Sequence, residues 1–332
     1  MDAGYESLRD IAIKIVKDHQ DTESNKGPNE RSIFILGSKC CGKTTLLNQF
    51  LEKTEAIRPT LALDYSFMRK TSHAGQNMRR QVCHIWELGG ASRTSSETLV
   101  KVPFMASSKQ TVIPTTIVLM LDMSKPKSIW SDMEETIASL KLALSIEVSK
   151  GSKEVYGLYQ NRIENPLPED HPDVGSINPF PVPLLVIGGK YDIFQDYEPE
   201  IKKRICKTLR SCCHLLGATL LFYSQFDSNF IKRAKQILND AAFGRLNDAQ
   251  VKGLSTDYNK PLFVVAGSDS WSSIGTEPLT LSAISVAHSQ WFPSESFKAV
   301  TIEDPAADPA FREDELDAAR SHATHKTVID FR

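Results

Sequence analysis

The residues from 37 to 45 have the types and the spacing of a phosphate-binding loop. In order they are Gly37, Ser38, Lys39, Cys40, Cys41, Gly42, Lys43, Thr44 and Thr45, which satisfies the pattern Gly-x-x-x-x-Gly-Lys-Ser/Thr. Glycines allow the backbone to wrap closely around a phosphate, and a following helix points its first amide hydrogens at that phosphate. Lys43 would reach the β- and γ-phosphates, and the Thr44 hydroxyl would coordinate Mg²⁺. The loop therefore predicts a nucleotide site, although a glycine turn that holds no ligand has the same appearance in a sequence.

Two further positions decide whether such a site could hydrolyse a nucleotide. In GTPases the strand that enters the second switch ends in Asp-x-x-Gly, and here Glu87 stands in place of the aspartate, with Gly90 as the glycine. The longer carboxylate could still hold a metal-bound water. Ras-like enzymes then carry a glutamine that orients the attacking water, and the residue here is Ala91, which cannot orient water. We therefore expect any hydrolysis to be very slow.

A threonine in the first switch would complete the metal site. Thr60 is the natural candidate for the residue that caps the metal and senses the γ-phosphate, but it could equally be the residue that opens the next strand. The predicted Mg²⁺ ligands are accordingly Thr44, Thr60 and Glu87.

Base recognition in GTPases uses Asn/Thr-Lys-x-Asp after a strand, and the nearest match here begins at Gly189. Asp192 could accept hydrogen bonds from the guanine N1 and exocyclic amine, and the stem of Lys190 could stack on the base. Gly189 cannot supply the side-chain amide of the usual motif, so the preference for guanine is weakened. Ser224, after the next strand, is a candidate for the third base-recognition loop.

The elements that must position these residues can be predicted from hydrophobic periodicity. The pattern predicts strands at 32–36, 62–67, 81–88, 115–121, 184–187 and 219–223, and helices at 43–53, 129–149, 199–216 and 229–243. Strands that alternate with helices predict an α/β fold, a doubly wound and mostly parallel sheet of the P-loop, small-GTPase-like type. Residues 156–183 carry six prolines and should form an irregular insertion, since proline excludes a long helix.

The same patterns divide the chain into three parts. Residues 1–20 form an N-terminal amphipathic helix, 30–245 the Ras-like P-loop domain, and 246–332 a C-terminal extension that is partly packed and partly a disordered tail. Within the extension, 262–266 is either an added strand or a packed segment. We expect the first helix and the extension to pack on a partner or back onto the domain. The apolar residues that would do so are Leu8, Ile11, Ile15, Phe263, Val264 and Trp291.

Composition narrows the range of functions. The formal net charge is −2, so no bulk attraction to nucleic acid is expected. The longest apolar stretches are too short to span a bilayer, and the first 20 residues lack the apolar core of a signal peptide. The six cysteines show no Cys-x-x-Cys spacing, which favours reduced thiols over disulfides or zinc. A cytoplasmic protein without membrane insertion is expected.

An ordered set of short segments resembles the cytoplasmic dynein light intermediate chains, and among them the dynein-2 branch. The segments run from Arg58 to Tyr65, His84 to Gly90, Leu121 to Pro126 with Trp130, Asn178 to Pro183, Lys190 to Asp196, Cys206 to Arg210, Leu216 to Thr219, Pro261 to Gly267 and Asp304 to Pro309. Each string is weak alone, but together they cover nearly the whole chain in the family's order.

The resemblance implies a non-catalytic subunit whose Ras-like domain clamps onto the tail of the dynein-2 heavy chain, beside the other subunits of that motor. It would stabilise the heavy chain for retrograde intraflagellar transport and cilium assembly, contacting the transport machinery indirectly. The expected locations are the cytoplasm, the cytoskeleton and the cilium, including the axoneme and basal body region. Bound GTP or GDP, with or without Mg²⁺, would be structural. In that family the dynein-1 relatives carry a much longer C-terminal region, which favours the dynein-2 branch for a chain that stops at Arg332.

Two other classes remain open from the residues alone. An active small GTPase that acts as a trafficking switch would show hydrolysis and nucleotide-dependent partner affinity, which Ala91 disfavours. A P-loop kinase or ATPase would need a cluster of lid arginines or an acceptor-binding carboxylate, and the sequence identifies neither.

Overall fold

The computed structural model describes residues 30–54, 56–74, 77–90, 102–104, 113–149, 160, 162–164, 166–243, 253–293 and 318. The predicted N-terminal helix, Ala91 and the end of the predicted tail lie outside these ranges. The chain divides into two units, Met1–Phe292 and Pro293–Arg332. The first unit contains every strand of the described residues and the predicted nucleotide site.

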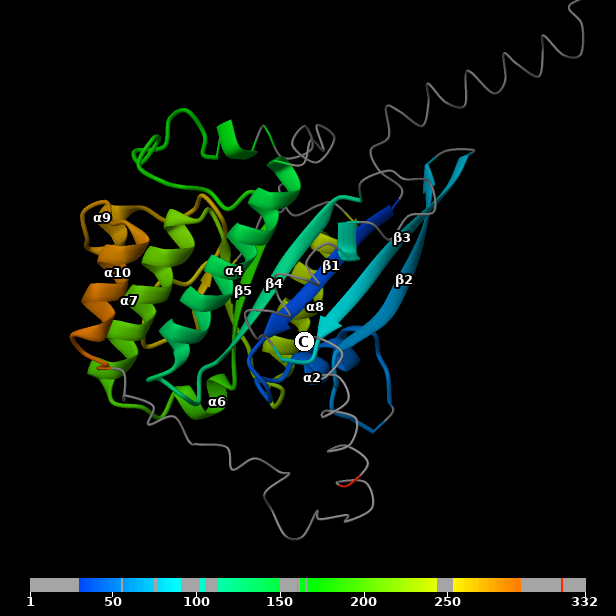
Figure 1. Cartoon of the computed structure of the whole chain (residues 1–332), viewed down its shortest axis with the longest axis horizontal. Coiled ribbons are helices and arrows are strands. Elements are labelled where there is room, and N and C mark those ends of the chain that lie inside the picture. Colours follow the sequence, from blue (N-terminus) through cyan, green and yellow to red (C-terminus); the bar gives the residue numbers. More distant parts are fainter. Residues whose placement is uncertain are drawn as a thin grey trace, which may run out of the picture. The chain divides into compact units, whose positions relative to one another are not determined.

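The centre of this unit is a seven-stranded sheet in the order β2-β3-β1-β4-β5-β6-β7 (Figure 1). The strands are β1 (Glu30–Gly37), β2 (Leu63–Ala74), β3 (Asn77–Leu88), β4 (Thr115–Asp122), β5 (Leu184–Gly189), β6 (Thr219–Phe222) and β7 (Phe263–Val264). Neighbours from β3 to β6 run parallel, while β2 and β7 are antiparallel additions at the two edges. The predicted α/β, mostly parallel sheet is confirmed.

Two helical layers cover the sheet. The helices are α2 (Lys43–Phe50), α4 (Ile129–Ser149), α6 (Tyr191–Phe194), α7 (Pro199–Leu215), α8 (Ser228–Phe243), α9 (Trp271–Ile274) and α10 (Leu281–Ser289), with a 3-10 turn, η1, at Val102–Phe104. Helices α4 and α7 share one hydrophobic cluster with α9 and α10, and α2 and α8 share the cluster on the opposite face.

Strand β1 illustrates why the central strands are continuous apolar runs. Phe34 and Leu36 belong to the cluster on the α4 face, whereas Ile33 and Ile35 belong to the cluster on the α2 face. Alternate side chains of a strand point to opposite faces, so a strand with helices on both faces must be apolar throughout.

Several boundaries differ from the sequence-based expectation. Strands β2 and β3 extend the hairpin to Ala74 and Asn77, well beyond 67 and 81. The additional residues are mostly polar, and the two strands pair along their whole length. Helix α2 ends at Phe50 instead of 53, and α6, α9 and α10 were not predicted.

Residues 253–292 of the predicted C-terminal extension pack against the domain. Strand β7 pairs with β6, through Leu220 with Val264 and Leu221 with Phe263. Both β7 side chains are buried, so this part of the extension packs back onto the domain. Trp291, in contrast, is 56% exposed, with the guanidinium of Arg204 over its ring.

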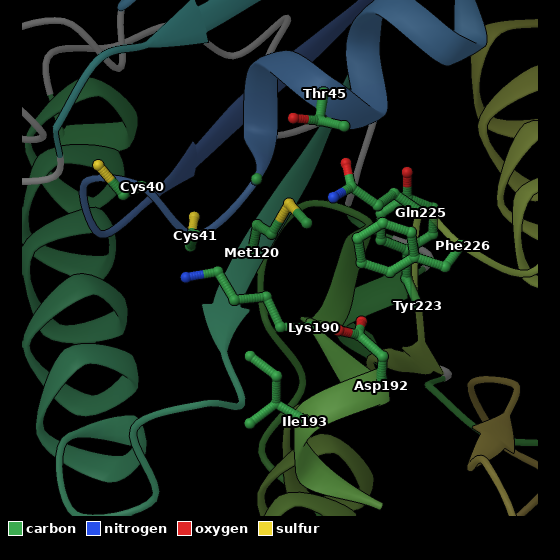
Figure 2. Close-up of a pocket in the computed structure, with 11 residues that line it drawn as sticks. Cys40, Cys41, Thr45, Met120, Lys190, Asp192, Ile193, Tyr223, Gln225 and Phe226 are labelled. Atoms are coloured by element: carbon green, nitrogen blue, oxygen red, sulfur yellow. The ribbon is translucent and has the colours of Figure 1, made fainter.

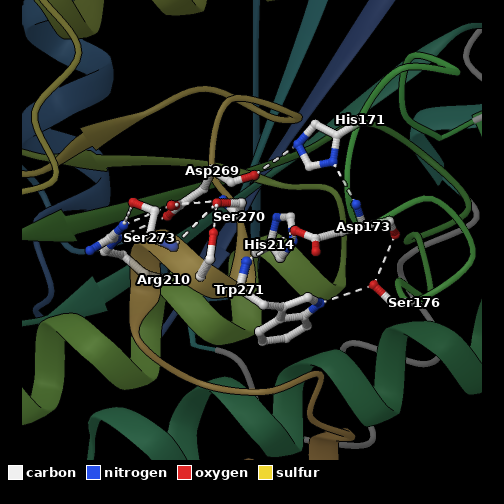
Figure 3. A network of polar contacts seen from close by, with 10 residues as sticks. His171, Asp173, Ser176, Arg210, His214, Asp269, Ser270, Trp271 and Ser273 are labelled. Atoms are coloured by element: carbon white, nitrogen blue, oxygen red, sulfur yellow. Dashed lines mark hydrogen bonds and ion pairs between the residues drawn. The ribbon is translucent and has the colours of Figure 1, made fainter.

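A buried ion pair attaches α9 to α7 (Figure 3). The Arg210 guanidinium donates to both carboxylate oxygens of Asp269, at 2.8 and 2.7 Å, and also to the Ser273 hydroxyl at 2.9 Å. Planar, bidentate pairs of this kind fix orientation as well as distance. The position of α9 is thereby fixed to the middle of α7.

A second group of contacts joins the proline-rich loop to the same place (Figure 3). The carboxylate of Asp173 lies 2.9 Å from His214 Nε2 and accepts from the backbone N–H of Trp271 at 3.0 Å. The Trp271 indole N–H donates to the Ser176 hydroxyl at 3.1 Å. Burial lowers the pKa of His214 despite its bond to Asp173. The irregular loop is therefore held by side chains from both α7 and α9.

Candidate nucleotide site

The phosphate-binding loop joins β1 to α2 and follows the path its glycines permit. Gly37 has φ 147° and Gly42 has φ 104°, and a Cβ on Gly37 would lie only 2.1 Å from the Met120 carbonyl oxygen. A side chain is therefore excluded at Gly37 by both conformation and space. Cys40 also has a positive φ, of 61°, and is exposed, whereas Cys41 is buried.

Lys43 lies inside this loop rather than in solvent. Its ammonium donates to the carbonyl oxygens of Gly37 and Ser38, at 2.9 and 2.8 Å, and the residue is only 4% exposed. These bonds hold the cation at the centre of the loop. Lys43 is consequently placed where a bound phosphate would meet both the ammonium and the first amides of α2.

The three predicted metal ligands lie together at the end of β3. The Thr44 hydroxyl donates to Glu87 Oε1 at 2.6 Å and lies 3.5 Å from the Thr60 hydroxyl. Glu87 is 1% exposed, and its Oε2 has no hydrogen-bond partner within the described ranges. Burial raises the pKa of Glu87, and the bonds from Thr44 and Thr60 and the charge of Lys43 only partly oppose it.

This arrangement fits a small, hard cation. Mg²⁺ prefers oxygen ligands, and the site offers two hydroxyls and one unpartnered carboxylate oxygen. A cation beside Glu87 would also offset the cost of burying its negative charge. Elsewhere in the described residues, no group of three or more His, Cys, Asp or Glu side chains could hold a metal ion.

A pocket of about 350 Å³ lies beside the phosphate-binding loop, between the carboxyl ends of β4, β5 and β6 (Figure 2). It is lined by Cys40, Cys41, Gly42, Thr45, Met120, Lys190, Asp192, Ile193, Tyr223, Gln225 and Phe226. Ligands of open α/β sheets bind at this end of the strands. The structure thus brings Lys190 and Asp192 to the same pocket as the loop.

The polar groups of this pocket are fixed by neighbours. Asp192 accepts a hydrogen bond from the Ser224 hydroxyl at 2.7 Å, which orients its carboxylate. Lys190 forms an ion pair with Asp122 at 2.7 Å. Burial disfavours the charge of Asp122, but the bonds from Lys190 and Ser124 outweigh this effect and lower its pKa. With its ammonium engaged, Lys190 offers the pocket its aliphatic stem.

Gly189 stands where the usual motif has an asparagine or threonine, and there is no space for a side chain. A Cβ there would lie 2.7 Å from Met120 Cε and 2.9 Å from the Cys41 carbonyl oxygen. The Met120 methyl group would also be 3.2 Å from a Cβ on Gly42. Met120 therefore fills, as an apolar wedge, the space between the phosphate-binding loop and β5.

Several lining residues escaped sequence-based reasoning. Met120 is an apolar residue in a buried strand, and nothing in its context separates it from core residues. Gln225 and Phe226 directly follow Ser224, so extending the third base-recognition loop by two residues would have found them. Asp122 ends β4 and could have been identified as a polar residue at the carboxyl edge of the sheet.

The sheet order, the loop between β1 and α2, and the Lys190–Asp192 pair at the end of β5 define a P-loop domain of the small-GTPase-like class. A solved structure, the crystal structure of the dynein light intermediate chain's conserved domain, has a similar fold, with a TM-score of 0.54 at 16% identity. The match covers 79% of this chain and 89% of that one.

Sequence comparisons identify the family. Residues 9–153 match the model of the dynein light intermediate chain family. Proteins named cytoplasmic dynein 2 light intermediate chain 1 are 39% identical in Mus musculus, with 88% of this chain and 84% of that one covered. Those of Bos taurus and Danio rerio are 38% and 37% identical, each with 95% of this chain and 92% of the relative covered. The chain belongs to the dynein light intermediate chain family.

Proposed function

We propose that this chain is a non-catalytic light intermediate chain of the cytoplasmic dynein 2 motor. It binds and stabilises the heavy-chain tail, beside the other subunits, for retrograde intraflagellar transport and cilium assembly. It acts in the cytoplasm and on the cytoskeleton of the cilium, including the axoneme and basal body region. The observation that carries the proposal is the 37–39% identity, over 88–95% of the chain, to relatives whose names contain cytoplasmic dynein 2.

Within this subunit the P-loop holds GTP or GDP as a structural cofactor. Lys43 and the first amides of α2 bind phosphate, and the Lys190 stem and Asp192 orient the base. Mg²⁺, when bound, is held by Thr44, Thr60 and Glu87 and neutralises phosphate charge. The oxygen ligands and the unpartnered Glu87 Oε2 support this assignment.

The non-catalytic character rests on the residues that differ from those of active GTPases. Glu87 replaces the usual aspartate. Its carboxylate accepts a hydrogen bond from the Thr44 hydroxyl, so it lies among the proposed metal ligands. Alanine at position 91 has no group to orient water. The residues of the site are suited to bind and position a nucleotide. A GTPase switch would in addition have to hydrolyse that nucleotide, which these residues do not favour.

The subunit assignment is tested by co-expression of the full chain with a dynein-2 heavy-chain tail, followed by affinity capture and light scattering. We expect a stable complex of defined stoichiometry. Failure of the two chains to co-purify, together with normal folding of each, would remove the proposal.

The nucleotide assignment needs a separate measurement. Bound nucleotide is released from the purified chain by denaturation, identified by chromatography, and its turnover timed. We expect GDP or GTP in a ratio near one per chain, with negligible turnover; Lys43→Ala should lose it and melt at a lower temperature, while the surface variant Lys202→Ala should retain it. Rapid turnover would favour the GTPase switch instead, and an empty site in the wild-type chain would contradict the structural-cofactor role.

A further inference from the structure

The hairpin of β2 and β3 presents aromatic side chains to solvent. Tyr65 and Phe67, on the edge strand β2, are 45% and 50% exposed. Their rings lie 6.4 Å apart, and the Tyr65 ring lies 4.6 Å from that of Trp86 on β3. The Tyr65 hydroxyl is 2.9 Å from His84 Nδ1, which fixes its ring over β3. We call Tyr65, Phe67, His84 and Trp86 the aromatic face of the hairpin.

The opposite face of the same hairpin is packed. Cys83 and Ile85 belong to the hydrophobic cluster of α2 and α8, and Met68 packs against it. Because side chains alternate along a strand, Tyr65, Phe67 and Trp86 must point to the other side of the sheet. An antiparallel hairpin with one packed face usually carries polar residues on its other face. Here that other face is aromatic instead.

Along the rest of the sheet, the aromatic side is covered by helices. Helices α4 and α7 share their cluster with residues of β1, β4, β5 and β6 on this side. Leu63 and Trp86 lie at the margin of the same cluster, so the aromatic face continues the core outward to the sheet edge. A helix laid against the hairpin would continue this layer, because helices cover the faces of such sheets.

The charge of the aromatic face selects the kind of partner. The described side chains on this side of the two strands include two exposed arginines, Arg69 and Arg80, and neither aspartate nor glutamate. The neighbouring strand β1 adds one acid, Glu30, whose carboxylate lies 3.8 Å from His84 Nε2, so the basic residues remain in excess. The Arg69 guanidinium lies 5.0 Å from the centre of the Phe67 ring, so cation and aromatic ring form one surface. Tyrosine, tryptophan and arginine are the residues that most often carry binding energy at protein interfaces.

We propose that the aromatic face docks an amphipathic helix of the partner chain whose apolar stripe is flanked by aspartate and glutamate. The apolar stripe covers Tyr65 and Phe67, and the acidic residues pair with Arg69 and Arg80. Resting on the proposed function, the inference assigns this helix to the dynein-2 heavy-chain tail. A strand added to the β2 edge would leave the rings uncovered, because they project from the face of the sheet and not from its edge.

The test measures the affinity of the full chain for the heavy-chain tail by biolayer interferometry. We expect Tyr65→Ser with Phe67→Ser to weaken binding at least tenfold. The charge reversals Arg69→Glu and Arg80→Glu should weaken it similarly and reduce its dependence on salt. Val286→Ser is the matched control: Val286 is an apolar residue on α10, 58% exposed, and its replacement should leave the affinity unchanged.

The outcomes separate this inference from the proposed function. If the wild-type chain binds the tail and both double variants bind equally well, the aromatic face is not the docking site and the function stands. If the wild-type chain does not bind the tail, the function and the inference fail together. If the serine double variant lowers the melting temperature of the isolated chain by several degrees, the chain's own residues cover the face, which overturns the inference. A change in oligomeric state with the variants would assign the face to a second copy and also overturn it.

Discussion

Glu87 combines two properties that rarely occur together in a carboxylate. It is almost completely buried, yet only one of its oxygens has a hydrogen-bond partner within the described ranges. Burial is the main reason for its raised pKa. An acid of this kind is costly when charged, so the stability of the nucleotide-free and metal-free chain should depend on its protonation.

The sign of this dependence is set by the direction of the pKa change. As the pH rises from about 4, the unfolded chain loses the Glu87 proton first, because its pKa there is the ordinary one. Stability due to Glu87 is therefore present at low pH and decreases as the pH rises through the raised pKa of the folded state. We expect the free energy of unfolding of Glu87→Gln, minus that of the wild type, to increase with pH over this range.

Urea denaturation of the wild type and of Glu87→Gln at several pH values, with a chelator present, measures the difference in their free energies of unfolding. Glu30→Gln serves as the control, because Glu30 is an exposed carboxylate near the start of β1. A difference that stays flat or decreases with pH would mean that Glu87 is charged without penalty.

Gly189 supports a second prediction at this scale. A methyl group there would approach the Cys41 carbonyl oxygen to 2.9 Å, and a backbone atom cannot move away as a side chain can. We expect Gly189→Ala to lower the free energy of unfolding by about 1–3 kcal/mol, the usual cost of overpacking. Gly90→Ala is the control, since its closest neighbours are methylene groups of the flexible Lys39 side chain. Equal effects of the two variants in chemical denaturation would contradict the close approach of the Cys41 carbonyl oxygen to Gly189.

Functional residues can be identified from the sequence alone only where they lie close together in a short motif. The phosphate-binding loop, Lys190 and Asp192 could be identified because each lies in a short pattern after an apolar strand. The pairing of Asp122 with Lys190 joins residues 68 positions apart, and the contact of Met120 with Gly189 is decided by packing. Neither leaves a signal in the local sequence.

At the scale of elements, buried strands were the easiest to predict. Strands β4 and β5 are apolar on both faces, so their runs stand out from the flanking residues. Helices α9 and α10 are short and rich in serine, and intrinsic propensity does not favour them. They form because Ser270 and Thr280 cap their first turns and because Trp271 and Ile284 reach the core.

The attachment of α9 gives a prediction at this scale. Asp269→Ala would leave the Arg210 guanidinium buried without its carboxylate, so we expect a loss of about 3–5 kcal/mol in the free energy of unfolding. Glu200→Gln removes an exposed pair with Arg204, at 3.8 Å, and should cost at most about 0.5 kcal/mol. Chemical denaturation compares the two variants. A similar small cost for both would show that the Arg210–Asp269 pair does not stabilise the fold.

For the whole molecule, the sequence-based domain boundary at residue 245 differs from the structural division after Phe292. Composition suggested the earlier boundary, since serine and proline become frequent after it. The later segment nevertheless supplies β7 and two helices, and most of their large apolar residues, with the exception of Val286, pack in the hydrophobic clusters. The average composition of a segment does not show which of its apolar side chains are buried.

Truncation of the chain tests whether the folded domain ends near residue 245 or after Phe292. A chain that ends at residue 245 lacks the later segments that pack against β6, α4 and α7. It also lacks the Ser285 hydroxyl, which accepts from the Trp130 indole N–H at 2.9 Å. We expect it to aggregate or to melt without cooperativity, whereas a chain that ends at residue 293 should unfold in one transition. Circular dichroism and light scattering compare the two chains. Cooperative unfolding of the shorter chain would restore the earlier boundary.

The late position of β7, α9 and α10 also has a consequence during synthesis. Chains grow by about 5–20 residues per second, so the roughly 50 residues that follow α8 take on the order of 2–10 s to appear. Until β7 emerges β6 is an unpaired edge, and until the end of the interval the core residues of α7 lack the full cover of α9 and α10. The nascent chain therefore passes through a state with an exposed apolar edge. Codon changes that slow translation of this stretch should lower the yield of folded subunit while leaving the melting temperature of the folded fraction unchanged.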